Sequence, residues 1–399
     1  MFQCFKNEKF QSYIGVPFLI LAIVLFIHSR DFSLDFSISL DQYLYSSWLF
    51  NYEYGFMQRG LIGELLSKIN YPRDYSHIRY IAISIYLLVY YTLYILIFNC
   101  LKKLNLNKNE IFLYVTCFFF CSFTLSQFTL ELGRFDQLFQ LLSLFFLVIV
   151  LNNKNIYISS IYILLVIPFI TLTHEAGIII FLPTILIIYY LEYSNIKPII
   201  FFSLFAIISI LLITHFGKIN ADHLQRLINN YISYKGYNEF AFRTTSLSLY
   251  ENLLMNWHSL IEKRTLIPIT LCLVIISPLI ILIIKSINSK KYLLLFIFTA
   301  TPLGLSLIAF DYFRWISLFT FNIFVLLIYL INKKLIDISL LKHNLKLYKK
   351  NIIIYSFISL FLGPLGVINI YPHIQKNNDG GLSSANLPLK TQQKLNFLQ

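Results

Sequence analysis

Residues 199–213 read IIFFSLFAIISILLI, and residues 266–284 read LIPITLCLVIISPLIILII. Each run is close to the roughly 20 residues that a helix needs to cross the hydrocarbon core of a membrane. The abundance of Ile does not argue against a helix here, because in lipid the backbone must satisfy its own hydrogen bonds and a helix does so locally. These two runs therefore predict transmembrane helices.

The rest of the 399-residue chain has the same character. Hydrophobic residues make up 57% of it, charged residues 13%, and the mean hydropathy is +0.69, whereas soluble domains carry about 25% charged residues. The ten-residue alternating segments of a transmembrane β-barrel are absent from the sequence. We expect an all-α integral membrane protein in which residues 1–370 form one polytopic bundle. It should have about eleven helices, at about 13–28, 78–99, 110–126, 136–151, 156–172, 176–191, 198–215, 265–284, 292–309, 313–331 and 351–370.

Lysine predicts the orientation of this bundle. With the N-terminus inside, 16 of the 23 lysines lie in cytoplasmic segments, as the positive-inside rule requires. The net charge of +13 then reports topology and does not indicate a nucleic-acid partner. We expect a multi-pass protein of the cytoplasmic (inner) membrane with two larger external loops, about 29–77 and 216–264. Residues 371–399 should form an external, disordered tail.

All nine arginines fall outside on this topology. Arginine presents a planar, permanently charged fork that suits phosphate or carboxylate groups. We expect four of them to bind the phosphate of a lipid-linked donor molecule: Arg59, Arg134, Arg243 and Arg314. The alternative is that these side chains reach the lipid headgroups and serve only as anchors.

The first external loop contains an acidic and aromatic segment followed by an amphipathic helix. Asp31, Asp35 and Asp41 come first, and the stretch 54–66, YGFMQRGLIGELL, follows. Its apolar residues recur every four positions after a glycine turn, which is typical of a helix lying in the membrane interface. This helix is either part of a site or a surface anchor.

Three further short segments carry charge between apolar runs: ELGRFDQ at 131–137, THEAG at 173–177 and DYFRW at 311–315. Ionisable residues at such depth are costly and usually face a cavity, a partner or a substrate. Asp136 and Asp311 are therefore catalytic candidates. The alternative is that Arg134 with Asp136, and Asp311 with Arg314, form local ion pairs that each close a turn.

His174 and Glu175 form the sharpest candidate for catalysis. No lysine or arginine lies near them in the sequence, so we expect burial to raise the pKa of the Glu175 carboxyl. A carboxyl with a raised pKa can accept a proton near neutral pH. We therefore expect Glu175 to act as a general base, and His174 either to orient it or to contact a donor phosphate.

The second external loop is rich in aromatic residues. Tyr234, Tyr237 and Trp257 offer faces on which sugar rings stack, although the loop could equally be a helical cap packed on the bundle. Walker, zinc-protease, nucleophile-elbow and dinucleotide-binding motifs are absent from the sequence. The five cysteines predict neither a disulfide framework nor a metal site, and we expect no cofactor.

The pattern of spans and external arginine loops resembles bacterial O-antigen or capsule repeat-unit polymerases. The acidic first loop is also similar, more loosely, to that of GT-C-type transferases that use polyprenyl-phosphate sugars. Both resemblances imply a polyprenyl phosphate or diphosphate glycan as donor, with the membrane lipid around it, and the first implies a chain-length regulator protein as partner. The GT-C resemblance implies a catalytic aspartate among Asp31, Asp35 and Asp41.

Three functions follow from this reading. The first is a glycosyltransferase that polymerises lipid-linked repeat units on the outer face of the membrane. The second is a transferase that adds a single sugar from a polyprenyl-phosphate donor. The third, from another class, is a flippase for lipid-linked oligosaccharides, but flippases need charge at the midplane and internal repeats, whereas the charges here cluster toward one face.

Overall fold

The computed structural model describes residues 11–28, 40–217, 219, 221–244, 263–287, 290–307 and 311–365. Every regular element within these ranges is a helix. Six of the helices are long and apolar enough to cross a membrane: α5 (Tyr75–Lys103), α8 (Phe135–Asn152), α9 (Ile156–Thr173), α10 (Ala176–Tyr193), α11 (Ile196–Phe216) and α18 (Tyr312–Asn332). They coincide with six of the expected spans. The chain is therefore an all-α, multi-pass membrane protein.

The other five expected spans are not among these six helices, and four of them form shorter or interrupted helices. The first span comprises the π-helix η2 (Gln11–Gly15) and α2 (Val16–His28). The span at 110–126 divides into α6 (Lys108–Phe119) and α7 (Leu125–Leu130), and that at 292–309 into α16 (Lys290–Phe298), α17 (Thr301–Gly304) and η3 (Leu305–Leu307). α15 (Lys263–Ser286) and α20 (Lys349–Leu362) occupy the remaining two. A count of eleven membrane-crossing helices is not confirmed.

The break between α6 and α7 has a clear physical cause. The backbone N–H of Ser122 donates to the Ser359 hydroxyl of α20 at 2.8 Å, and the Ser122 hydroxyl reaches the Ser359 carbonyl oxygen at 2.8 Å. The Thr124 hydroxyl donates toward the carbonyl oxygen of Cys121, also at 2.8 Å. These bonds satisfy backbone groups that an uninterrupted helix would pair internally. Contacts with a distant helix therefore decide where α6 ends.

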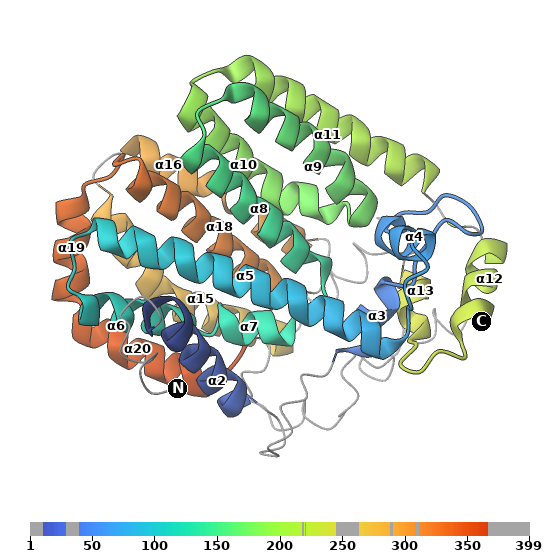
Figure 1. Ribbon diagram of the computed structural model, residues 1–399, viewed down its shortest axis with the longest axis horizontal. Coiled ribbons are helices and arrows are strands. Elements are labelled where there is room, and N and C mark those ends of the chain that lie inside the picture. Colours follow the sequence, from blue (N-terminus) through green and yellow to red (C-terminus); the bar gives the residue numbers. More distant parts are fainter. Residues whose placement is uncertain are drawn as a thin grey trace.

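Helix α18 is the centre of the bundle, and α11 lies at its edge. The apolar segment of α18 is 83% buried, whereas that of α11 is 17% buried. α18 packs against α5, α8 and α10, while α11 contacts α9 and α10 (Figure 1). Many apolar side chains of α11 are exposed, so this helix presents a broad apolar surface. A membrane-embedded bundle has such outward apolar faces because lipid covers them.

Different short helices lie at the two ends of the bundle. At one end, α3 (Gln42–Ser47), α4 (Leu61–Lys68), α12 (Ala221–Tyr231) and α13 (Glu239–Thr244) form a cap, and α19 (Ile338–Leu347) lies at the opposite end (Figure 1). The Tyr231 hydroxyl joins the parts of the cap, since it accepts hydrogen bonds from Asn51 and Arg73, each at 2.8 Å. α4 confirms the helix expected after the glycine turn. It packs closely on the chain before it, because a Cβ at Gly63 would lie 2.1 Å from the Phe50 carbonyl oxygen.

We expect the cap and α19 to face opposite sides of the membrane, with the lysine-rich α19 end inside. Single cysteines at the exposed positions Asn229 of α12 and His343 of α19 test this in a Cys4→Ser background, because the cysteines at 100, 117, 121 and 272 are buried. An impermeant thiol reagent should label N229C in intact cells and H343C only after permeabilisation. A K346C variant, on the same helix as His343, is the matched control. Labelling of both ends from one side would contradict the orientation.

Candidate active site

The carboxylate of Glu175 is paired with a guanidinium from a distant part of the chain. Arg59 Nη2 lies 2.5 Å from Glu175 Oε1, and Arg59 Nε lies 3.3 Å from Oε2. Arg59 belongs to the segment between α3 and α4 and has a left-handed backbone (φ 65°). Glu175 begins α10 at the break after α9. The pair therefore joins the cap to the helix bundle, and each side chain is 23% exposed.

This pairing corrects the expected protonation behaviour of Glu175. Burial opposes the charged carboxylate, but the Arg59 guanidinium beside it outweighs that effect and lowers the pKa of Glu175 to about 2. The expectation of a raised pKa was wrong, because the compensating cation lies 116 residues away in the sequence. In this arrangement Glu175 is ionised at neutral pH and is a weak base.

His174 lies between the Arg59–Glu175 pair and a second group of charges. Its Nδ1 is 4.0 Å from Glu175 Oε2, and its ring also interacts electrostatically with Arg314 and Asp136. Burial, followed by the nearby Arg59 cation, lowers the pKa of His174 to about 3. The imidazole is therefore neutral at physiological pH. Its buried Nδ1 has no hydrogen-bond partner among the described residues.

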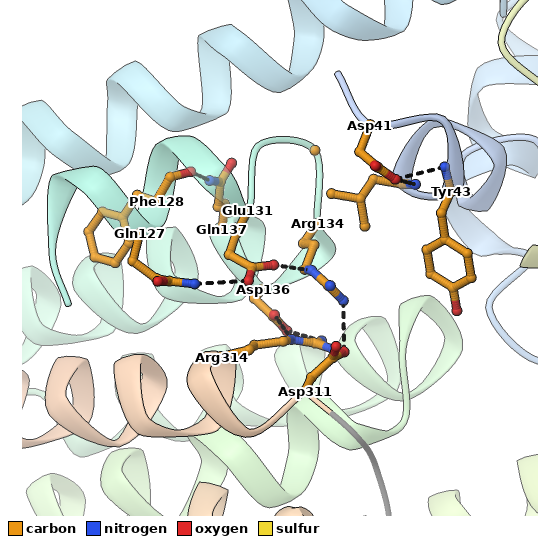
Figure 2. Close-up of polar contacts among 12 residues, drawn as sticks. Asp41, Tyr43, Gln127, Phe128, Glu131, Arg134, Asp136, Gln137, Asp311 and Arg314 are labelled. Atoms are coloured by element: carbon orange, nitrogen blue, oxygen red, sulfur yellow. Dashed lines mark hydrogen bonds and ion pairs between the residues drawn. The ribbon is translucent and has the colours of Figure 1, made fainter. Parts of the chain in front are cut away.

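The second group of charges combines two of the sequence segments singled out above (Figure 2). Arg314 of α18 forms a bidentate pair with Asp136 of α8, with Nη2 2.9 Å from Oδ1. Arg314 Nη1 and Arg134 Nη1 each lie 3.0 Å from the same Asp311 oxygen. Arg134 is also paired with Glu131 one turn earlier. Of the two local ion pairs considered from the sequence, Asp311–Arg314 exists, whereas Asp136 pairs with Arg314 of α18 and Arg134 pairs with Glu131 and Asp311. Pairs between α8 and α18 join these charges into one network.

The cluster takes its geometry from helices that begin at the cap end. Arg134 is the N-cap residue of α8, Glu175 that of α10, and Asp311 that of α18. Helix N-termini carry partial positive charge and favour anions. Tyr43 of α3 lies beside this group and interacts electrostatically with both Arg59 and Arg134. Four of the expected catalytic residues and three of the four expected arginines are thus brought together.

Asp41 and Arg243 have other local roles in the structure. Asp41 is the N-cap of α3, and its Oδ1 accepts hydrogen bonds from the backbone N–H groups of Tyr43 at 2.8 Å and Leu44 at 3.2 Å. Arg243 forms an ion pair with Glu239, one turn away on α13, at 2.5 Å. Asp41 therefore begins a helix near the cluster, and the known pairing of Arg243 is local.

The expected sugar-contacting aromatics help to build the cap. Tyr234 stacks edge-on against Tyr231 at 5.2 Å between ring centroids, and Tyr237 packs on Phe242 at 5.3 Å. Both side chains are partly buried against the core. Burial, and then the charge of Glu239, raises the pKa of Tyr237. Its hydroxyl is buried without a hydrogen-bond partner among the described residues. Trp257, Asp31 and Asp35 lie outside the described residues.

Two residues of the site were not expected from the sequence. Glu131 was part of the 131–137 segment but not a candidate, although it shares Arg134 with Asp311. The signal was its spacing of three residues from Arg134, which places the two side chains on one face of a turn. Tyr43 gave no comparable signal, because its position depends on how α3 packs over the bundle. No group of His, Cys, Asp and Glu suited to a metal ion occurs in the described ranges.

Fold and site together define a multi-pass membrane protein with a charged, partly exposed cluster at the capped end of its bundle. No family model, curated protein or solved structure matches the chain.

Proposed function

We propose that this protein is a membrane glycosyltransferase that polymerises lipid-linked oligosaccharide repeat units on the outer face of the cytoplasmic membrane. The observation that supports this most is that Arg59, which pairs with Glu175 beside His174, and Arg134 both interact electrostatically with Tyr43 at the capped end of the bundle. Arg59 Nη1 and Arg134 Nη2 have no hydrogen-bond acceptor among the described residues. Two such N–H edges at a membrane surface suit the phosphate of a lipid-linked donor.

The charge balance of the cluster determines how a phosphate would bind. Four carboxylates (Glu131, Asp136, Glu175 and Asp311) face the guanidiniums of Arg59, Arg134 and Arg314. A phosphate added to this group would meet an excess of negative charge, so it must replace a carboxylate. Glu175 is the one to leave, because its pair is partly exposed and Arg59 belongs to a connecting segment.

This exchange would also activate Glu175. With a donor phosphate on Arg59, the carboxylate keeps its buried surroundings but loses its cation, and its pKa rises toward neutrality. Glu175 then takes the proton of an acceptor sugar hydroxyl while that oxygen attacks the anomeric carbon of the donor. The bond from the anomeric carbon to the phosphate oxygen breaks, and the polyprenyl diphosphate leaves with the electron pair. Arg59 and Arg134 stabilise the charge that develops on it.

A gene deletion in the producing cell distinguishes the three candidate functions. Loss of a polymerase should leave complete, single lipid-linked repeat units on the outer leaflet. Loss of a single-sugar transferase should leave lipid-linked units that lack one sugar, and loss of a flippase should leave complete units on the inner leaflet. Mass spectrometry of extracted lipids, with glycosidase access to intact spheroplasts, separates these outcomes. Only the first agrees with the proposal.

Arg59→Lys and Arg134→Lys should each reduce polymer formation about tenfold or more in the complemented deletion strain. Lysine keeps the charge but cannot form the forked contact, and a hydrogen bond to a charged group is worth roughly 1.5–3 kcal/mol. Glycan length and amount on gels, normalised to protein level, provide the measurement. Arg226→Lys, at an exposed position on α12, is the matched control and should behave as wild type. Wild-type polymer from both R59K and R134K would exclude this phosphate site.

A further inference from the structure

A groove lies between the N-terminal helices and α5. It has a volume of about 320 Å³ and is lined by Tyr13, Ile14, Pro17, Phe18, Leu21, Leu87, Tyr90 and Tyr91. Several of these side chains are partly open to the surroundings, including Ile14 (53% exposed) and Leu87 (40%). The groove thus combines an apolar lining with access from the side of the bundle.

Two hydrogen bonds fix the walls of the groove. The Tyr90 hydroxyl donates to the carbonyl oxygen of Pro17 at 2.6 Å, and the Tyr94 hydroxyl donates to that of Ser12, also at 2.6 Å. Both tyrosines are buried, so these bonds are shielded from competing water. The groove is therefore held open by polar bonds between its two walls.

A cation lies at one end of this apolar surface. Lys102 Nζ is 3.2 Å from the Tyr13 hydroxyl and 4.5 Å from the ring centroid of Phe98. Tyr13 itself lines the groove. Neither Lys102 nor its neighbour Lys103 is paired with a carboxylate among the described residues. An apolar groove that ends at an ammonium group without a carboxylate partner complements a molecule with a hydrocarbon chain and an anionic head group.

We propose that this groove binds an anionic glycerophospholipid, with one acyl chain along the groove and the phosphate beside Lys102. The chain contributes through burial, at roughly 0.8 kcal/mol for each CH₂ group covered. The ammonium adds selectivity, because a basic residue near the membrane surface favours anionic lipids. This site does not depend on the proposed glycosyltransferase activity, since it lies between α2 and α5 and shares no residue with the charged cluster.

Native mass spectrometry of the full chain in detergent tests the proposal with phosphatidylglycerol and phosphatidylcholine that carry identical acyl chains. Wild-type protein should bind phosphatidylglycerol at least threefold more tightly. Lys102→Gln should weaken phosphatidylglycerol binding about fivefold and leave phosphatidylcholine binding unchanged. Lys103→Gln, the same change one residue away, should have the smaller effect, because Lys103 does not contact Tyr13 or Phe98.

Leu87→Trp should fill the groove and weaken the binding of both lipids at least fivefold. Leu88→Trp is its control, since Leu88 is 51% exposed but does not line the groove. If L87W does not fold, Ile14→Trp on the opposite wall replaces it. Equal binding of the two lipids to wild-type protein would overturn the proposal, as would unchanged binding in a folded groove-filling variant.

Discussion

Replacing Asp136 with alanine is expected to destabilise the protein by about 3–5 kcal/mol, because the buried Arg314 guanidinium loses its bidentate partner and keeps only the Asp311 oxygen that it shares with Arg134. The Asp136 and Arg314 side chains are only 5% and 7% exposed, so water cannot compensate. Asp136 was expected to be catalytic and Arg314 to bind phosphate. Their bidentate pairing joins α8 to α18 beneath the more exposed charges, and we propose that they act as positioning residues. The measurement is the thermal unfolding midpoint of purified protein in detergent, which should fall by many degrees.

A double variant and a surface variant provide the controls. Asp136→Leu with Arg314→Met removes both charges and should recover most of the lost stability, since apolar residues of similar size often replace buried ion pairs at little cost. Glu239→Ala breaks the more exposed Arg243 pair (Glu239 41% exposed) and should cost under about 1 kcal/mol. An Asp136→Ala protein that unfolds at the wild-type midpoint would show that the buried pair does not hold the two helices together.

The sequence predicted the parts of the fold that depend on local hydrophobicity. Runs such as 199–213 become long helices because a membrane segment can satisfy its backbone only by forming a helix. The lengths of the other segments were less predictable. The segment 110–126 breaks at Ser122 because Ser359, 237 residues away, supplies its hydrogen-bond partner, and no local pattern contains that contact. The N-cap role of Asp41 was open to prediction, since aspartate before a short amphipathic stretch is a preferred helix start.

The sequence predicted the charged segments of the candidate site but did not predict which charged residues form ion pairs with each other. Charged residues between apolar runs proved a sound guide, because the 131–137, 173–177 and 311–315 segments meet in one network. Their pairing could not be read from the sequence. Glu175 has no cation near it along the chain, yet Arg59 is bound to it in space. The sequence therefore indicated charged segments that meet in space, but electrostatic arguments from sequence distance gave Glu175 the wrong pKa.

Glu175→Gln is expected to reduce glycan polymerisation by about 10²–10⁴-fold, the usual contribution of a general base. Glutamine keeps the shape of the side chain but cannot accept the hydroxyl proton. Single lipid-linked repeat units should accumulate, measured by mass spectrometry of extracted lipids at matched protein levels. His174→Asn is expected to have a smaller effect, because the imidazole is already neutral with a pKa lowered to about 3 and lacks the acidic proton of an imidazolium at neutral pH.

The pH dependence of the reaction rate distinguishes a catalytic base from a purely structural ion pair between Glu175 and Arg59. In the free protein the pKa of Glu175 is lowered to about 2. If Glu175 has only a structural role, its ion pair with Arg59 therefore stays intact between pH 5 and 8, and the rate does not change over this range. If a donor phosphate displaces Glu175 from Arg59, the carboxyl gains a higher pKa, and the rate in a saturated enzyme should rise with pH and level off once the carboxyl has lost its proton. Glu175→Asp should retain part of the activity and the same rising profile, whereas the residual activity of Glu175→Gln should be independent of pH. A flat wild-type profile, or full-length polymer from E175Q, would refute the exchange at Arg59 and leave Glu175 as a structural partner of the cap.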